Sequence, residues 1–379
     1  MTHRGRWTLA LLTAVLIGAA IYVSTTRRTI RPAGVGELLY PALEASLDEV
    51  TSIRIRGPGA KTAVTLERAE SGWRVAERGG YPADASRVRT LLLGLAQART
   101  IEEKTTLPAN YPSLGVEDLA TPDATGAGVE LGGPVKPVSL IVGKSPGARS
   151  TYVRRKGEAA SWQIGTALTV ERDPAKWLAT ELLDIGADRI QSAEFTTDGK
   201  HRWTAEKASR ADQSFSIAGK SASGSASNPG SSTDQVATGL AGLRLVDVRP
   251  AKDANKDKPA ATATYRTFDG LVLAIEGYAE GDKRFVRVRP SVDESAARRF
   301  FAAAAAPADK TGAADAAPSK PPAHEASGEK STPPAAGPES VVAQTREEST
   351  KLETRLTGWS FEIPDWSYDA VFPGKSVSR

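Results

Sequence analysis

The chain lacks the residues that most metal and redox sites need. It has no cysteine and only three histidines among 379 residues. The absence of Cys excludes disulfides, zinc–thiolate sites and lipoprotein acylation. His324 lies in a segment expected to be disordered, and His201 follows Asp198 and Gly199 in an expected hairpin turn. We therefore predict no metal site, no cofactor and no catalytic residue.

The chain also has almost no excess of charge outside its first residues. Its net charge is +4, from 49 basic and 45 acidic residues. A nucleic-acid-binding surface needs a basic excess that can follow phosphates. Five arginines at the N-terminus leave about −1 for the remainder of the chain, so we predict no nucleic-acid partner. These arginines are Arg4, Arg6, Arg27, Arg28 and Arg31.

Long apolar runs are absent except for one, between Trp7 and Val23. A helix of this length spans roughly 25 Å, close to the hydrocarbon core of a bilayer of about 30 Å. The sequence therefore predicts a membrane anchor with basic flanks over residues 1–31. The residues expected to contact the membrane are Trp7, Leu11, Leu12, Val15, Leu16, Ile17, Ile21, Tyr22 and Val23.

A cleaved signal peptide is the alternative for the same residues, because Arg4 and Arg6 precede the run and small residues lie at 18–20. We favour an uncleaved signal anchor, since the run exceeds the usual apolar region of a signal peptide. Positive charge flanks the apolar run on both sides, so the charge rule alone does not decide the orientation of the helix in the membrane. A short N-terminal tail and the lack of Cys favour a single-pass protein of the bacterial inner membrane with most of the chain in the periplasm.

The chain shows one pattern twice, over about 48–160 and 188–290. Each copy begins with alternating apolar residues, at 50–55 and 190–195, that indicate strands. A helix should follow, because Val88, Leu91 and Leu95 recur at helical spacing and Val236 and Leu240 echo it. The predicted fold class is α+β: two tandem related units of mainly antiparallel sheet with packed helices, after one N-terminal transmembrane helix.

The composition divides the region after the anchor into four parts. Ser/Gly-rich and Ala/Pro-rich stretches predict flexible or disordered segments. The expected parts are a first unit at 48–187 ending in a connecting helix at 174–185; a second unit at 188–290 with a flexible loop near 220–232; a helical hairpin at 291–356 interrupted by a disordered insertion at 307–337; and a closing strand and tail at 357–379.

Several short motifs resemble those of a known family. They are Trp73-Arg-Val, Tyr81-Pro-Ala-Asp, Leu114-Gly-Val, Leu140-Ile-Val-Gly and Gly358-Trp-Ser-Phe-Glu-Ile-Pro. Together they resemble the DUF4340 proteins, a bacterial family of unknown function, over roughly 48–372. The resemblance implies one N-terminal membrane span and an accessory role beside ABC-type transport components of the gliding-motility kind. It transfers no catalytic residue. The Ser/Gly loop and the Ala/Pro insertion depart from the family pattern.

One motif imitates a nucleotide site. Gly143-Lys144-Ser145 looks like the end of a phosphate-binding loop, but Val138 occupies the position of the required first glycine. A Gly-x-Ser-x-Gly elbow of serine hydrolases is also missing from the sequence. We therefore expect neither phosphate-loop nor serine-hydrolase chemistry.

Six tryptophans leave two interpretations open. Most fall within regular strand or helix patterns, which favours a role in the core over a sugar-stacking platform. They are Trp73, Trp162, Trp177, Trp203, Trp359 and Trp366.

The functional hypothesis is a non-enzymatic, membrane-anchored periplasmic accessory or scaffold protein. Its expected partners are the inner membrane and an ABC transporter permease or another envelope protein. The alternative is a periplasmic glycan- or lipid-binding module.

Reporter fusions at the C-terminus test the expected location. A periplasmic reporter such as alkaline phosphatase should be active there, and a reporter that works only in the cytoplasm should be inactive. An active cytoplasmic reporter with an inactive periplasmic one would refute export.

Overall fold

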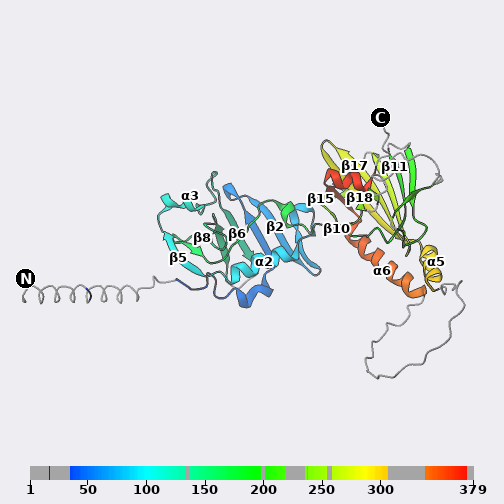
Figure 1. The fold of residues 1–379 in the computed structure, drawn as a ribbon. Coiled ribbons are helices and arrows are strands. Elements are labelled where there is room, and N and C mark those ends of the chain that lie inside the picture. Colours follow the sequence, from blue (N-terminus) through cyan, green and yellow to red (C-terminus); the bar gives the residue numbers. More distant parts are fainter. Residues whose placement is uncertain are drawn as a thin grey trace, which may run out of the picture. The chain divides into compact units, whose positions relative to one another are not determined.

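The computed structural model describes residues 17, 35–133, 136–197, 201–212, 214–218, 235–236, 238–253, 258–305 and 338–373. Its contacts divide the chain into two compact units, Met1–Ala179 and Thr180–Arg379 (Figure 1). The predicted loop at 220–232 and insertion at 307–337 lie outside the described residues, as does all of the predicted anchor except Ile17.

The first unit is built on a nine-stranded antiparallel sheet. Its strand order is β4-β3-β2-β1-β6-β7-β8-β9-β5. The elements are β1 (Ser52–Arg56), β2 (Thr62–Ala69), β3 (Gly72–Val75), β4 (Tyr81–Pro82), α2 (Ala85–Ala96), β5 (Thr100–Thr105), α3 (Tyr111–Leu114), β6 (Ala127–Gly132), β7 (Val138–Val142), β8 (Thr151–Arg155) and β9 (Ser161–Ile164).

Helix α2 forms where the apolar spacing predicts it. The carboxylate of Asp84 accepts hydrogen bonds from the backbone N–H groups of Ser86 and Arg87, which caps the N-terminus. The predicted stripe is buried, including Val88 and Leu95. The helix therefore packs against the unit through one apolar face.

The second unit contains an eight-stranded sheet and a separate two-stranded sheet, β10-β14. The order in the larger sheet is β13-β12-β11-β16-β17-β18-β19-β15. The elements are β10 (Glu181–Leu183), β11 (Ile190–Thr197), β12 (His201–Glu206), β13 (Ser216–Ile217), β14 (Leu243–Arg244), β15 (Asp247–Pro250), β16 (Ala261–Thr267), β17 (Leu271–Glu280), β18 (Lys283–Val292), α5 (Glu294–Ala305), α6 (Pro338–Leu356), β19 (Trp359–Ile363) and α7 (Asp365–Val371).

The two large sheets follow the same strand order. Strands β1, β2, β3 and β5 to β9 correspond in chain order to β11, β12, β13 and β15 to β19, and each set is arranged identically across its sheet. Strand β4 has no counterpart in the larger sheet of the second unit. This shared, non-sequential order is typical of a duplicated unit. The second copy carries an insertion, because α5 and α6 separate β18 from β19, whereas residues 156–160 alone join β8 to β9.

The expected fold class is wrong in its content of helices, and its expected transmembrane helix lies, except for Ile17, outside the described residues. The structure consists of three mostly antiparallel sheets with few helices. Among the residues it describes, no helix is both long and apolar enough to cross a bilayer. Strands such as β17 and β18, of 10 residues each, join as hairpins and carry most of the core.

The predicted connecting helix at 174–185 is also wrong. Residues Pro174–Trp177 form one 3-10 turn, capped by the Asp173 carboxylate, and Glu181–Leu183 form strand β10, paired with β14. A short apolar run fits both helical and extended backbone, so its periodicity alone does not distinguish them.

An aromatic cluster forms the core of the second unit on one face of its sheet. The Phe195 ring stacks on Trp203 at 4.5 Å between centroids and meets Tyr265 edge-on at 5.6 Å. The Tyr265 hydroxyl donates to the backbone oxygen of Val371 at 2.8 Å, which ties α7 to this face. The ring of Tyr265 is fully buried, and burial raises the pKa of its hydroxyl well above the usual value.

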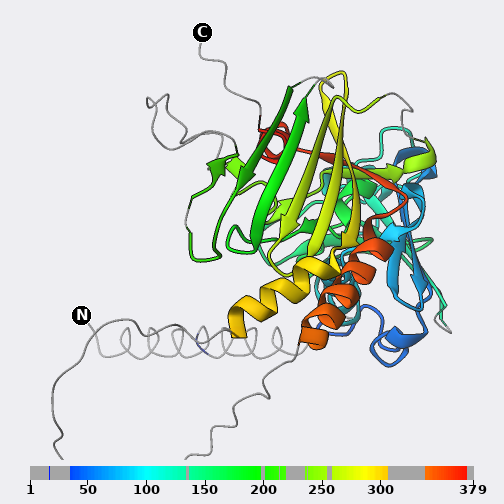
Figure 2. The ribbon, with the colours of Figure 1, turned by 90° about the vertical axis from the view of Figure 1, so that its right-hand side faces the viewer.

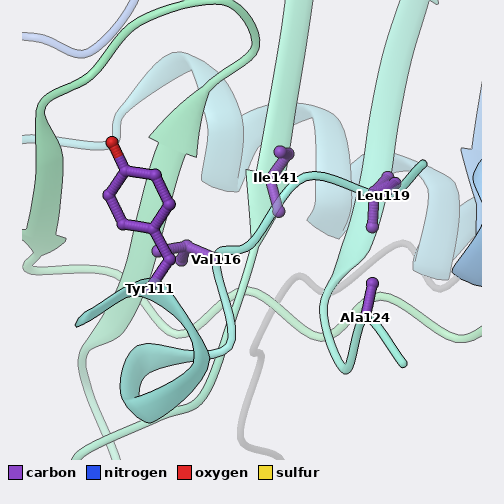
Figure 3. Packing of buried hydrophobic residues seen from close by; sticks show 5 residues of the cluster. All are labelled: Tyr111, Val116, Leu119, Ala124 and Ile141. Carbon is purple, nitrogen blue, oxygen red and sulfur yellow. The ribbon is translucent and has the colours of Figure 1, made fainter. Parts of the chain in front are cut away.

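A smaller apolar cluster in the first unit gathers the loop around α3 against β7. Its buried members are Tyr111, Val116, Leu119, Ala124 and Ile141 (Figure 3). Two of the family-like motifs meet beside it, because Gly143 follows β7 and packs against the carbonyl oxygen of Leu114. Gly115 has a φ of 71°, which favours glycine. The motif glycines therefore allow two backbone segments to approach closely.

Replacing Gly143 by Ala tests this close approach. The added Cβ would overlap the carbonyl oxygen of Leu114, so we expect the free energy of unfolding to fall by about 1–3 kcal/mol. Gly147→Ala is the matched control, because its Cβ would lie 3.8 Å from the nearest atom, Ser150 Oγ. Urea denaturation measures both. Equal stabilities of the two variants would contradict the packing argument.

Candidate functional site: a helical arm on the second unit

The free edges of the large sheets are poorly suited to pairing with another strand. Strands β4 and β13 have two residues each, and β5 has two register shifts against β9. At β15, the N–H of Val248 donates to the Asp247 carboxylate at 2.8 Å, and Pro250 has no N–H. Short, irregular or donor-poor edges disfavour strand addition. These edges therefore favour a partner that is bound by side chains over one that adds a strand.

The hollow beside α2 is small. It measures about 160 Å³ and lies between the first turns of α2 and residues 167–177, with Trp177 in its lining. Pockets for small-molecule ligands usually measure about 300–1,000 Å³. This hollow is therefore too small to enclose a ligand of that kind.

The residues that imitate nucleotide and metal sites have structural contacts instead. The Lys144 ammonium group donates to the backbone oxygens of Pro112 and Ser113 at 3.2 and 3.1 Å, at the end of α3. His201 is the first residue of β12, not part of a turn, and His324 lies outside the described residues. Within the part of the chain that the structure describes, no group of three or more His, Asp or Glu side chains is placed to hold a metal ion.

Helices α5 and α6 form an arm at one end of the second sheet, side by side (Figure 2). Arg189, just before β11, fastens α6 to the sheet. Its two terminal nitrogens donate to the two Glu348 carboxylate oxygens at 3.0 and 2.8 Å, a bidentate pair. The same guanidinium donates to Asp269, in the turn between β16 and β17, at 2.8–3.1 Å. One cation therefore joins three segments far apart in the sequence.

Further contacts fix the arm at the same turn. The Thr345 hydroxyl on α6 donates to the backbone oxygen of Asp269 at 3.0 Å. The Asp293 carboxylate accepts from the Ala296 N–H at the start of α5, and the Asp293 N–H donates to Gly270. Gly270 has a φ of 87° and abuts Asp293, so the turn requires a residue without a side chain. Both helices are thus anchored to the β16–β17 turn.

Electrostatics favour the charged form of this junction. Arg189 is about three-quarters shielded, with 23% of its side chain exposed. Its hydrogen bonds to Glu348, together with the charge of Asp269, raise the pKa of Arg189 further above its usual value despite the opposing effect of burial. The guanidinium therefore stays protonated wherever the fold is stable.

The outward face of α6 is polar and lies free of the sheet. Its pattern alternates buried positions such as Val342, Ser349 and Leu352 with exposed ones. Lys351 and Glu347 form an exposed ion pair one helical turn apart at 2.6 Å. The exposed positions are Glu339, Ala343, Gln344, Arg346, Glu347, Thr350, Lys351, Glu353 and Thr354. We call this set the outer face of the arm.

The sheet face of β15 to β18 carries arginines stacked on aromatic rings. Arg249 lies 4.1 Å from the Phe285 ring centroid, and Arg287 lies 4.5 Å from that of Tyr278. Arg249 also pairs with Glu280. Burial, with a smaller effect of Glu276, raises the pKa of Tyr278. The guanidinium groups cover these aromatic rings, so the contacts on this face stabilise the fold.

The six tryptophans are divided between the two units. Three lie in the first unit: Trp73 in β3, Trp162 in β9 and Trp177 in the 3-10 turn. Trp203, Trp359 and Trp366 lie in β12, β19 and α7 of the second unit. Five of the six are buried or half-buried, in agreement with core roles, and only Trp366 is largely exposed, at 74%.

Sequence reasoning missed the junction of the arm. Asp269-Gly270 is a turn signal between two apolar runs, and it marks the β16–β17 hairpin. Nothing in the local pattern links that turn to Glu348, 79 positions later, or to Arg189. Only the folded arrangement brings the three charges together.

The described fold is that of a duplicated antiparallel-sheet protein with a helical arm inserted in its second copy. The family model for the domain of unknown function DUF4340 matches residues 73–264, just over half of the chain, so the chain belongs to this family. The match begins in β3 and ends in β16, so it spans parts of both units. No curated protein and no solved structure matches the chain.

Arg189→Met tests the junction of the arm. The variant keeps the aliphatic volume but leaves the Asp269 and Glu348 carboxylates without their shared cation. We expect the free energy of unfolding to fall by about 2 kcal/mol and proteolysis of α6 to accelerate. Lys351→Met, on the outer face of the same helix, should cost less than about 0.5 kcal/mol. Denaturation curves for Arg189→Met that match those of the control would show that the junction contributes little.

Proposed function

We propose that the chain is a non-enzymatic accessory or scaffold protein held at the periplasmic side of the bacterial inner membrane. Its partner would be a transport or envelope assembly, with an ABC-type permease as the first candidate, and the outer face of the arm would bind it. The observation that carries this proposal is the insertion of α5 and α6 into one copy of a duplicated fold, fastened there by Arg189.

The position of the arm supports a binding role. Where β8 and β9 are joined by residues 156–160, the second copy carries two helices between the corresponding strands. Additions to the loops of a stable scaffold commonly carry function, because they do not disturb the core. An arm already ordered by ion pairs and caps also loses less conformational entropy when it binds.

The polar character of the arm suits an accessory contact. Its outer face has both charge signs, including Arg346, Glu347 and Lys351, and few apolar groups. Such a surface favours a modest, reversible interaction over a permanent one. Attachment to the membrane through the apolar stretch 7–23 would raise the effective concentration beside a membrane partner, so a weak contact would suffice.

The alternative, a periplasmic module that binds a glycan or a lipid, has one observation in its favour. Trp366 exposes an indole ring to solvent in the second unit.

Site-specific photocrosslinking in intact cells tests the proposal. A photoreactive residue at Glu347, Lys351 or Glu353, on the outer face, should crosslink to subunits of a membrane assembly, identified by mass spectrometry. The same residue at Glu67, exposed on β2 of the first unit, serves as the control. Equal products from both sites, none from the arm, or a chain recovered from the cytosol would refute the proposal.

A further inference from the structure

The chain enters the first unit beside the edge strand β5. The Gly36 N–H donates to the Thr100 carbonyl oxygen at 2.7 Å, and the Thr100 N–H donates to that of Glu37 at 3.0 Å. The Leu39 N–H donates to the Ala98 carbonyl oxygen at 2.7 Å. These bonds continue the pairing past the start of β5, which forms one edge of the nine-stranded sheet. Backbone pairing therefore fixes the entry point at this edge.

Side chains hold the same segment in place. Leu39 and Leu43 are buried. The Nε and Nη2 groups of Arg155 donate to the Leu39 carbonyl oxygen at 3.2 and 2.6 Å, and the guanidinium lies 5.6 Å from the Tyr40 ring centroid. The Tyr40 hydroxyl donates to the Ser139 carbonyl oxygen at 2.9 Å. The segment therefore cannot leave the β5 edge without breaking several contacts.

Covalent geometry limits how far this edge can lie from the apolar stretch. Val23 is the last residue of that stretch, and Gly36 follows 13 positions later. An extended chain advances at most about 3.6 Å per residue, so Gly36 lies no more than about 47 Å from Val23. Because the proposed function places residues 7–23 in the membrane, it also keeps the β5 edge within this distance of the bilayer.

Exposed apolar side chains lie at this edge. Ile101 on β5 is 48% exposed, and Leu107, two residues after the strand, is 62% exposed. Ile101 abuts Gly165, where a Cβ would lie 3.4 Å from its Cδ1. The Leu107 N–H donates to the Thr105 hydroxyl oxygen at 3.1 Å, which holds the turn after the strand. Both aliphatic groups are therefore displayed on ordered backbone.

The charges of β5 favour an apolar contact over recognition of phosphate groups. Glu102 and Glu103 are exposed, and the Lys104 ammonium group pairs with Glu102 at 3.1 Å. The strand therefore has no basic excess that anionic head groups would attract. A bilayer interface buries aliphatic side chains without needing a partner of matching shape. Two such side chains bind weakly, but attachment of the chain to the same membrane raises their effective concentration.

We propose that the edge of the first unit formed by β5 and the turn after it rests on the lipid bilayer, with Ile101 and Leu107 among the head groups. This inference rests on the proposed membrane attachment and names the lipid surface as the partner of an edge that the arm does not involve.

Lipid-phase quenching tests the proposal on the full-length chain. The sequence has no cysteine, so each introduced cysteine is a unique site for a nitrobenzoxadiazole label. The protein is reconstituted in vesicles of phosphatidylethanolamine and phosphatidylglycerol, with doxyl-labelled phosphatidylcholine as the quencher. Labels at Ile101→Cys and Leu107→Cys should lose severalfold more fluorescence than a label at Glu70→Cys. Glu70 is exposed in the turn between β2 and β3, near the opposite edge of the sheet.

A second variant tests the role of the aliphatic groups. With the label at Thr106→Cys, Ile101→Ser together with Leu107→Ser should reduce the quenching severalfold. Circular dichroism verifies that each variant is folded, and these exposed substitutions should leave the thermal transition unchanged. Quenching at Thr106→Cys that is unaffected by the two serines would overturn the proposal.

A label at Ile17→Cys, in the apolar stretch, separates this inference from the proposed function. Quenching at Ile17→Cys without quenching at Ile101→Cys and Leu107→Cys would refute the lipid contact and leave membrane attachment intact. Absence of quenching at Ile17→Cys would refute attachment, and the inference with it. Shielding of the two edge labels that increases with protein concentration and not with quencher lipid would assign the edge to a second copy of the chain and overturn the proposal.

Discussion

Arg189 holds the second unit together at the place where three distant segments meet. It lies just before β11 and pairs with Asp269 in the β16–β17 turn and with Glu348 on α6. Partly shielded charges of this kind are expensive to separate, because removing one leaves the others without compensation. The orientation of the arm therefore depends on an interaction at its base and not on the apolar area between the helices alone.

The duplicated strand order explains why an arm can exist at all. Each copy closes its sheet with strands that return from elsewhere in the chain, β5 in the first unit and β15 in the second. The connection between β18 and β19 consequently joins two interior strands, each of which is held in place by pairing on both sides. An insertion there can extend outward without breaking the sheet, and the first copy shows that the fold does not need it.

Local patterns predicted local structure well and distant contacts poorly. Alternating residues near Ile53 and Ile275 lie in strands, and the stripe through Val88 and Leu95 lies on a helix, because side-chain periodicity follows backbone geometry directly. The run at 174–185 failed because a few apolar residues fit both periods. The Arg189 junction was inaccessible, since ion pairs across 80 to 159 positions leave no local signal.

The edges and faces of the sheets together restrict how this protein can meet a partner. Strand addition is disfavoured by the short edge strands, by the contact of Asp247 with the Val248 N–H and by Pro250. On the sheet face, stacked arginines such as Arg249 already contact aromatic rings. What remains available are side chains held away from these layers, on the outer face of the arm and at Ile101 and Leu107 beside β5. Both surfaces belong to elements fixed at their base, so a ligand would meet groups already in position, and less of its binding free energy would be spent on ordering them.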